Sequence, residues 1–133
     1  MGLFDLFRKK RELTDDELKW NKMWDLWADG KIASPYAELM TYQSEVNNGG
    51  HDQYFLNVGN TGSIENEMTM LEKLLPARLY SNLTDAYRAY QALEENEDDE
   101  KAAETLEKCD DFFYENDEEI NQILEKHSSQ ISL

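Results

Sequence analysis

Apolar side chains recur every three or four residues through nearly every segment of this chain, whereas no segment alternates apolar and polar residues as a half-buried strand does. The first example follows Thr14, where Trp20, Trp24 and Trp27 repeat at helical spacing on one face. For a chain of 133 residues, this periodicity predicts an all-α fold: a single domain of five or six helices packed as a compact bundle or orthogonal array.

Capping residues and helix breakers mark the boundaries between the predicted helices. Thr14 and Glu17 have the spacing of a capping box, in which each side chain accepts a hydrogen bond from the other residue's backbone N–H group. Ser34 is expected to cap the next helix, with Pro35 at its first position. Further boundaries are predicted at Gly30, residues 47–50, a turn at residues 57–62, a cap at Thr61 or Ser63, Pro76 and an acidic joint at residues 94–100.

Three regions are predicted: a basic amphipathic arm at residues 1–12, an all-α acidic domain at residues 13–127, and a frayed C-terminus at residues 128–133. One short amphipathic segment is not expected to bind a membrane stably. The arm is instead expected to move freely or to fold back on the protein's own acidic face. Docking onto a second copy would favour a homodimer, so the oligomeric state stays open.

The chain carries 29 Asp and Glu residues against 13 Lys and Arg, a net charge of −16. Most of the excess lies in residues 85–133, which hold 16 acidic and 4 basic side chains. Such a charge repels nucleic acid and anionic lipid, so direct binding to either is not expected. A single cysteine and the absence of a long apolar run fit a cytoplasmic protein.

Residues 97–119 separate on a helical wheel into an apolar side and an acidic side. A row of carboxylates follows steps of three and four residues from residue 100 to residue 118, a length of about 27 Å. The alternative to a binding surface is a solvated helix face that keeps the protein soluble. The predicted partner-binding acidic face comprises Glu97, Glu100, Glu104, Glu107, Asp111, Glu115, Glu118 and Glu119.

The most distinctive segment is residues 45–57, which reads E-V-N-N-G-G-H-D-Q-Y-F-L-N. Its glycine pair can adopt positive φ, end one helix and start the next within a few residues. Gln53 and Asn57, one helical turn apart, are expected to bond backbone carbonyls freed at this corner. The predicted structural motif comprises Asn48, Gly49, Gly50, Gln53, Tyr54, Phe55 and Asn57.

This motif resembles that of the bacterial DNA-mimic protein family. Members of the family share a domain described as DNA mimic protein C-terminal-domain-like, which is mostly of unknown function. The resemblance covers roughly residues 34–120 and includes residues 112–115. It implies an all-α fold in a cytosolic bacterial protein. For the founding member it implies an acidic dimer that imitates duplex phosphates and occupies a DNA-binding protein. His51 departs from the pattern, because relatives often carry a bulky aromatic residue there.

Catalytic signatures are missing from the chain: it has no zinc-binding H-E-x-x-H or C-x-x-C pair, no nucleophile elbow and no phosphate-binding loop. His51 and Asp52 are adjacent on a helix and point about 100° apart, so they do not form a dyad. Cys109 lies on the apolar face, where an inert buried thiol is expected. We therefore expect no enzyme activity, no metal and no cofactor.

The predicted function is that of a non-enzymatic acidic protein that binds a basic protein partner. Imitation of DNA phosphates, to occupy a DNA-binding regulator, is the favoured form. One alternative is an immunity or antitoxin-like protein that neutralises a basic toxin. Another is a small-ligand protein with a pocket near His51, Gln53 and Tyr54.

Overall fold

The computed structural model describes residues 12–133, and over these residues the chain is all-α. The helices are α2 (Asp15–Ala28), α3 (Tyr36–Thr61), α4 (Ile64–Glu72), α5 (Ala77–Glu95) and α6 (Glu100–Ser128). The predicted all-α single domain is confirmed. The arm predicted at residues 1–12 lies almost wholly outside the described residues.

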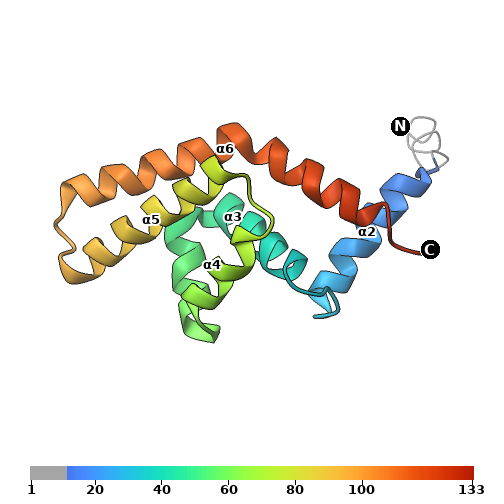
Figure 1. The fold of residues 1–133 in the computed structure, drawn as a ribbon, viewed down its shortest axis with the longest axis horizontal. Helices are drawn as coiled ribbons and strands as arrows, with labels where there is room; N and C mark the ends of the chain where they lie inside the picture. Colours follow the sequence, from blue (N-terminus) through green and yellow to red (C-terminus); the bar gives the residue numbers. More distant parts are fainter. Residues whose placement is uncertain (1–11) are drawn as a thin grey trace, which may run out of the picture.

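The longest helix, α6, runs along the length of the molecule; α2, α3 and α5 pack against it, whereas α4 packs against α3 and α5 (Figure 1). Helix α5 lies antiparallel beside its first half, α3 crosses near its middle, and α2 contacts its C-terminal half (Figure 1). The centre of the core is aromatic: Tyr42, Tyr54, Phe55 and Phe113 are all fully buried. Burial of each such ring contributes about 1.5–3 kcal/mol, and the rings of Tyr42 and Phe113, with centroids 5.4 Å apart, join α3 to α6.

Most predicted helix boundaries match the structure. Glu17 N–H donates to Thr14 Oγ1 and Thr14 N–H donates to Glu17 Oε1, each at 3.2 Å, so the predicted capping box is present. Helix α2 ends just before Gly30, which has φ +72°. Ser63 caps α4 by accepting from Asn66 N–H at 3.3 Å. The acidic joint separates α5 from α6, as predicted.

Two boundary predictions are wrong. The N-cap of α3 is Pro35 rather than Ser34, whose hydroxyl instead donates to Glu38 Oε2 at 2.7 Å. Residues 57–62 are not a turn, because α3 continues to Thr61. Burial of Val58 in the core keeps this segment helical despite its glycine and asparagine residues.

The predicted break at residues 47–50 is a kink inside α3. Gly49 has φ −157° and ψ 19°, and Gly50 has φ 78° and ψ −179°. The expectation for Gln53 and Asn57 is wrong in its acceptor: both amides donate to Glu45 Oε2, at 3.0 and 2.6 Å. A carboxylate is a stronger acceptor than a backbone carbonyl, and Glu45 lies one turn before the kink.

The C-terminal residues contact α2. Helix α6 ends at Ser128, and beyond it the Ser129 and Ser132 carbonyls accept from Lys19 Nζ at 3.2 Å and Lys22 Nζ at 2.6 Å. Ile131 packs against the core. Fraying of residues 128–133 stays a prediction.

A cluster of acidic and phenolic groups lies between α3 and α4. Among the described residues, Tyr54 hydroxyl and Glu38 Oε1 are buried without a hydrogen-bond partner. Burial, and then the carboxylates of Glu67 and Glu38, raise the pKa of Tyr54 well above its ordinary value. Burial, followed by the charge of Glu38, also raises the pKa of Glu67. Folding therefore makes the charged form of Glu67 less favourable than it is in the unfolded chain.

Glu67→Gln is expected to stabilise the protein at pH 7. A carboxyl with a raised pKa in the folded state contributes stability below its unfolded pKa, and this is lost as pH rises through the folded value. The expected gain is about 0.5 kcal/mol or less, because Glu67 is only partly buried and solvent screens its charge. Urea unfolding from pH 3.5 to 7 should show the gain growing with pH.

Glu65→Gln is the matched control on the same helix. A hydrogen bond from Tyr87 lowers the pKa of Glu65, so its charged form contributes stability that is lost as pH falls. This variant should be destabilised at pH 7, the opposite sign. A Glu67→Gln variant that is less stable than wild type at pH 7 would contradict the expectation.

Candidate protein-binding surface on helix α6

Helix α6 has one buried face and one acidic face. Its buried residues are Ala102, Leu106, Cys109, Phe113, Ile120, Leu124 and Ser128. Opposite them lie six exposed carboxylates, which we call the acidic row: Glu100, Glu104, Glu107, Asp111, Glu115 and Glu118. The helical repeat alone creates this separation, because residues three and four apart share a face.

The two other predicted acids of this face have different surroundings. Glu97 is exposed but precedes α6, in the connection from α5. Glu119 is partly buried and forms an ion pair with Arg78, whose guanidinium also donates to Asn116 Oδ1 at 2.6 Å. A cation of α5 therefore compensates Glu119, which lies to the side of the acidic row.

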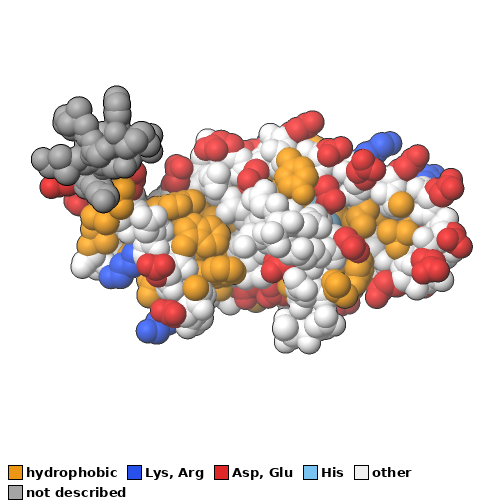
Figure 2. All heavy atoms as spheres, turned by 180° about the vertical axis from the view of Figure 1, so that it is seen from behind, with side chains coloured by type: hydrophobic (Ala, Val, Ile, Leu, Met, Phe, Trp, Pro, Cys, Tyr) orange, Lys and Arg blue, Asp and Glu red, His pale blue; other side chains and the backbone are white. Residues whose placement is uncertain are grey.

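No carboxylate of the acidic row forms an ion pair within residues 12–133. The ion pairs among these residues join His51 to Asp110, Arg78 to Glu119 and Arg88 to Asp85, and none involves a carboxylate of the row. Lys101 and Lys108 are exposed on the same helix without forming an ion pair. Figure 2, which shows the molecule from behind, likewise has many acidic and few basic side chains.

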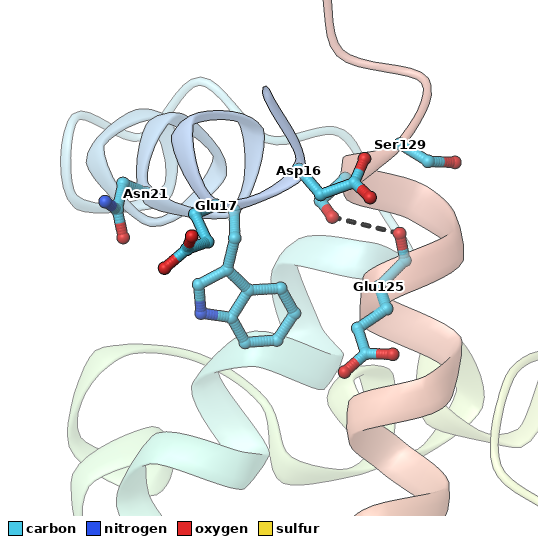
Figure 3. A pocket seen from close by; sticks show the side chains of 7 residues that line it. Asp16, Glu17, Asn21, Glu125 and Ser129 are labelled. Carbon is cyan, nitrogen blue, oxygen red and sulfur yellow. Dashed lines mark hydrogen bonds between the residues drawn. The ribbon is translucent and has the colours of Figure 1, made fainter. Parts of the chain in front are cut away.

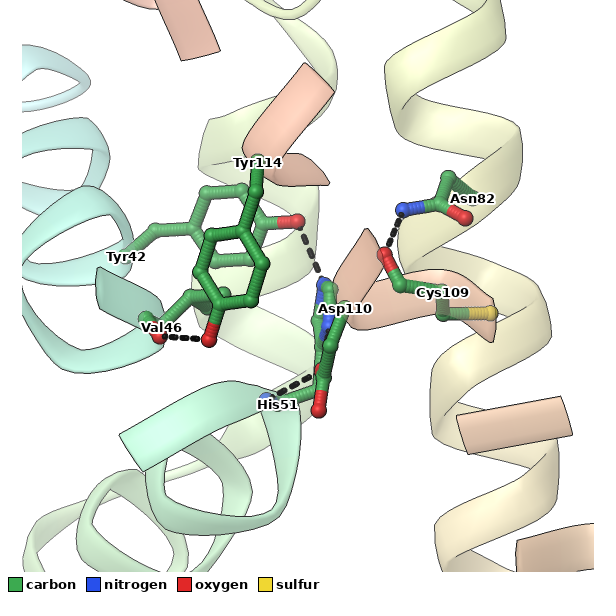
Figure 4. Close-up of polar contacts among 7 residues, drawn as sticks. All are labelled: Tyr42, Val46, His51, Asn82, Cys109, Asp110 and Tyr114. Carbon is green, nitrogen blue, oxygen red and sulfur yellow. Dashed lines mark hydrogen bonds and ion pairs between the residues drawn. The ribbon is translucent and has the colours of Figure 1, made fainter. Parts of the chain in front are cut away.

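A polar chain that the sequence analysis missed connects the kink of α3 to α6 (Figure 4). Asp110 Oδ1 accepts from His51 backbone N–H at 2.9 Å and lies 2.7 Å from His51 Nδ1. His51 Nε2 lies 2.7 Å from Tyr42 hydroxyl. Because an ionised carboxylate only accepts, Nδ1 donates to Asp110, and in the tautomer that carries its proton on Nδ1 the Nε2 atom accepts from Tyr42. Burial raises the pKa of Tyr42, which keeps this hydroxyl protonated.

A second set of contacts lies one to two turns further along α6. Asp117 accepts from Gln43 Nε2 at 2.9 Å and from Asn47 Nδ2 at 3.1 Å. Tyr114 hydroxyl donates to the Val46 carbonyl at 3.0 Å (Figure 4). The seven-residue spacing of Asp110 and Asp117, on a flank outside the acidic row, is the signal in the sequence that could have identified them. These two acids orient the helix, which leaves the acidic row free to face solvent.

The structure does not favour a ligand pocket near His51. This imidazole has no exposed surface, and both its nitrogens have partners. An open groove of about 500 Å³ lies elsewhere, between α2 and the end of α6 (Figure 3). Its lining consists of Asp16, Glu17, Trp20, Asn21, Glu125, Ser128 and Ser129.

Two chemical features limit what the described residues can do. Burial, and then the charges of Asp85 and Asp110, raise the pKa of the Cys109 thiol to about 11, so it remains protonated at neutral pH. Within residues 12–133, no group of three or more His, Cys, Asp or Glu side chains is arranged to hold a metal ion. Over the same residues, none of the helices is long and apolar enough to span a bilayer.

Comparison with known proteins identifies one family. No curated protein and no solved structure shows significant similarity to the chain. A family model described as DMP19-like protein matches residues 35–130, which is more than two-thirds of the chain. The match covers the kink of α3 and all of α6, and confirms the resemblance based on the Asn-Asn-Gly-Gly motif. The chain therefore belongs to the DMP19-like protein family, which takes its name from a DNA mimic protein.

Proposed function

We propose that this protein acts without catalysis by occupying the DNA-binding surface of a basic partner protein. The observation that carries this proposal is the acidic row: six exposed carboxylates in steps of three and four residues, with no ion pair among the described side chains. Membership of a DNA-mimic family supports a DNA-binding protein as the partner. Attraction between this row and a cationic groove would steer the two proteins together.

Charge spacing sets how closely the row can imitate DNA. Six carboxylates over about 27 Å give roughly one charge per 5 Å, against one per about 3.4 Å along a single DNA strand. One helix therefore supplies about two-thirds of the density of one strand. A homodimer with two neighbouring acidic rows would come closer to the charge density of a DNA duplex. We therefore propose that the protein acts as such a dimer.

Competition with DNA tests the proposed function. A cell extract is passed over immobilised duplex DNA at low salt, and the column is then eluted with this protein. We expect it to release a small set of DNA-binding proteins, because partner and DNA compete for one basic surface. Raising the salt from 50 to 300 mM should weaken the complex of a released protein with this chain, since charge pairs dominate the contact.

Polyglutamate of equal total charge is the matched control for this experiment. Release of the same proteins by polyglutamate, or release of none by this protein, would contradict DNA mimicry. Capture of a basic protein that does not compete with duplex DNA would instead favour the immunity or antitoxin-like alternative.

A further inference from the structure

One aromatic side chain stands beside the acidic row. Within residues 12–133, Tyr114 is the only exposed aromatic residue, with 47 % of its surface in solvent. It lies three residues after Asp111 and four before Glu118 on α6. Those spacings place an exposed carboxylate one helical turn away on either side of the ring.

The position of the Tyr114 ring is fixed by two contacts. Its hydroxyl donates to the Val46 carbonyl at 3.0 Å (Figure 4). Its ring meets that of the buried Phe113 edge-on, with centroids 5.8 Å apart. Burial and the nearby charges of Asp110 and Asp111 raise the pKa of Tyr114, so the hydroxyl keeps its proton. A ring already held in place loses little rotamer freedom when a partner binds.

Most charged groups near this ring are carboxylates, and some of them already have hydrogen-bond partners. On α6, Asp110 and Asp117 are hydrogen-bonded to α3, whereas Asp111 and Glu118 are exposed and unpaired among the described residues. From α3, the neighbouring groups are the Val46 carbonyl and the Asn47 amide, which donates to Asp117. Lys101 lies between three and four turns before Tyr114 and lines a depression beside α5. Lys108, six residues before Tyr114, is exposed and forms no ion pair among the described residues.

We infer that Tyr114, Asp111 and Glu118 form a docking platform for an arginine side chain of the basic partner. A guanidinium is planar and weakly hydrated, so it stacks on an aromatic ring and still donates to a carboxylate. An ammonium is compact and strongly hydrated, and gains less from the ring. The inference rests on the proposed function, and adds that the partner surface presents arginine at this point.

The platform would make the acidic face more selective than a row of phosphates. Carboxylates in water attract arginine and lysine through the same Coulomb interaction, whereas the ring discriminates between them. The DNA backbone offers no aromatic surface at the level of its phosphates. This protein would therefore distinguish among basic surfaces that DNA itself binds alike.

The probes for the test are fluorescent nona-arginine and nona-lysine peptides, titrated at low salt against wild type, Tyr114→Leu and Tyr114→Phe. An exposed cation–π contact is worth about 0.5–1 kcal/mol, which corresponds to a factor of about two to five in affinity. Tyr114→Leu should lower the ratio of arginine to lysine affinity by this factor. Tyr114→Phe, which keeps the ring, should retain most of the preference.

The outcomes separate this inference from the proposed function. If both peptides bind in a salt-dependent manner and Tyr114→Leu leaves their affinity ratio unchanged, the platform is wrong while the acidic row stands. If Tyr114→Leu weakens both peptides equally, the ring contributes no arginine preference and the platform is again wrong. If neither peptide binds wild type, both ideas fail. Thermal unfolding of each variant checks that the ratio was measured on folded protein.

Discussion

Replacing Glu104, Glu107, Asp111 and Glu115 together by lysine is expected to abolish binding to the partner that competes with DNA. The change raises the net charge from −16 to −8 and turns the middle of the acidic row cationic. Each contact between unit charges at 4 Å is worth about 1 kcal/mol even in water, so attraction becomes repulsion at several points. Affinity measured by calorimetry should fall at least about a hundredfold.

A second quadruple variant with the same net charge is the control. It reverses four exposed acids away from α6: Glu12, Asp25, Asp29 and Glu72. If net charge alone governs binding, both variants will lose the same affinity, and the acidic row has no special role. If the row is the interface, the control should bind within a few-fold of wild type. Circular dichroism should show that both variants remain helical, because the changed side chains are exposed.

The largest stability effect is expected for Gly50→Ala at the kink of α3. Gly50 has φ +78° and ψ −179°, a conformation that costs a residue with a side chain about 1–3 kcal/mol. A Cβ atom there would also lie 2.5 Å from Asp110 Oδ2. The carboxylate would have to move away from His51 and leave buried donors unpaired, at about 1–3 kcal/mol each. Together these effects predict a loss of about 3 kcal/mol or more in urea unfolding.

Gly59→Ala provides the comparison within the same helix. Gly59 has helical geometry, and its nearest neighbour would be Ile64 Cδ1 at an ordinary 3.5 Å. Alanine there should stabilise the protein by about 0.5–1 kcal/mol, because it restricts the unfolded chain. An unfolding midpoint for Gly50→Ala equal to that of wild type would show that the kink does not require glycine.

Local rules account for the helix boundaries that were predicted correctly. The capping box of Thr14 and the glycine pair at the kink each act over a few residues, so composition and spacing suffice to place them. The turn predicted at residues 57–62 is wrong because a tertiary contact, and not a local rule, decides the structure there. Its glycine and asparagine residues favour a turn locally, but burial of Val58 against the core outweighs that preference.

In helix α6, too, some features follow from the local sequence and others depend on tertiary contacts. Period and charge along α6 already separated carboxylates from apolar side chains, because that separation depends only on helix geometry. The spacing of Asp110 and Asp117 sets them on another flank, but the sequence could not reveal the partners of the acids outside the row. Glu119 meets Arg78, Asp110 meets His51 and Asp117 meets Gln43, across separations of 41, 59 and 74 residues.

By itself, then, the sequence determined the all-α class, the kink and the existence of an acidic helix face, since each follows from interactions between residues a few positions apart. Only the tertiary structure decided that His51 is a buried hydrogen-bonding residue rather than a ligand group. It also decided that Tyr114 stands exposed beside the row. These outcomes depend on how α3 and α6 pack, and packing brings together side chains whose proximity no local pattern records.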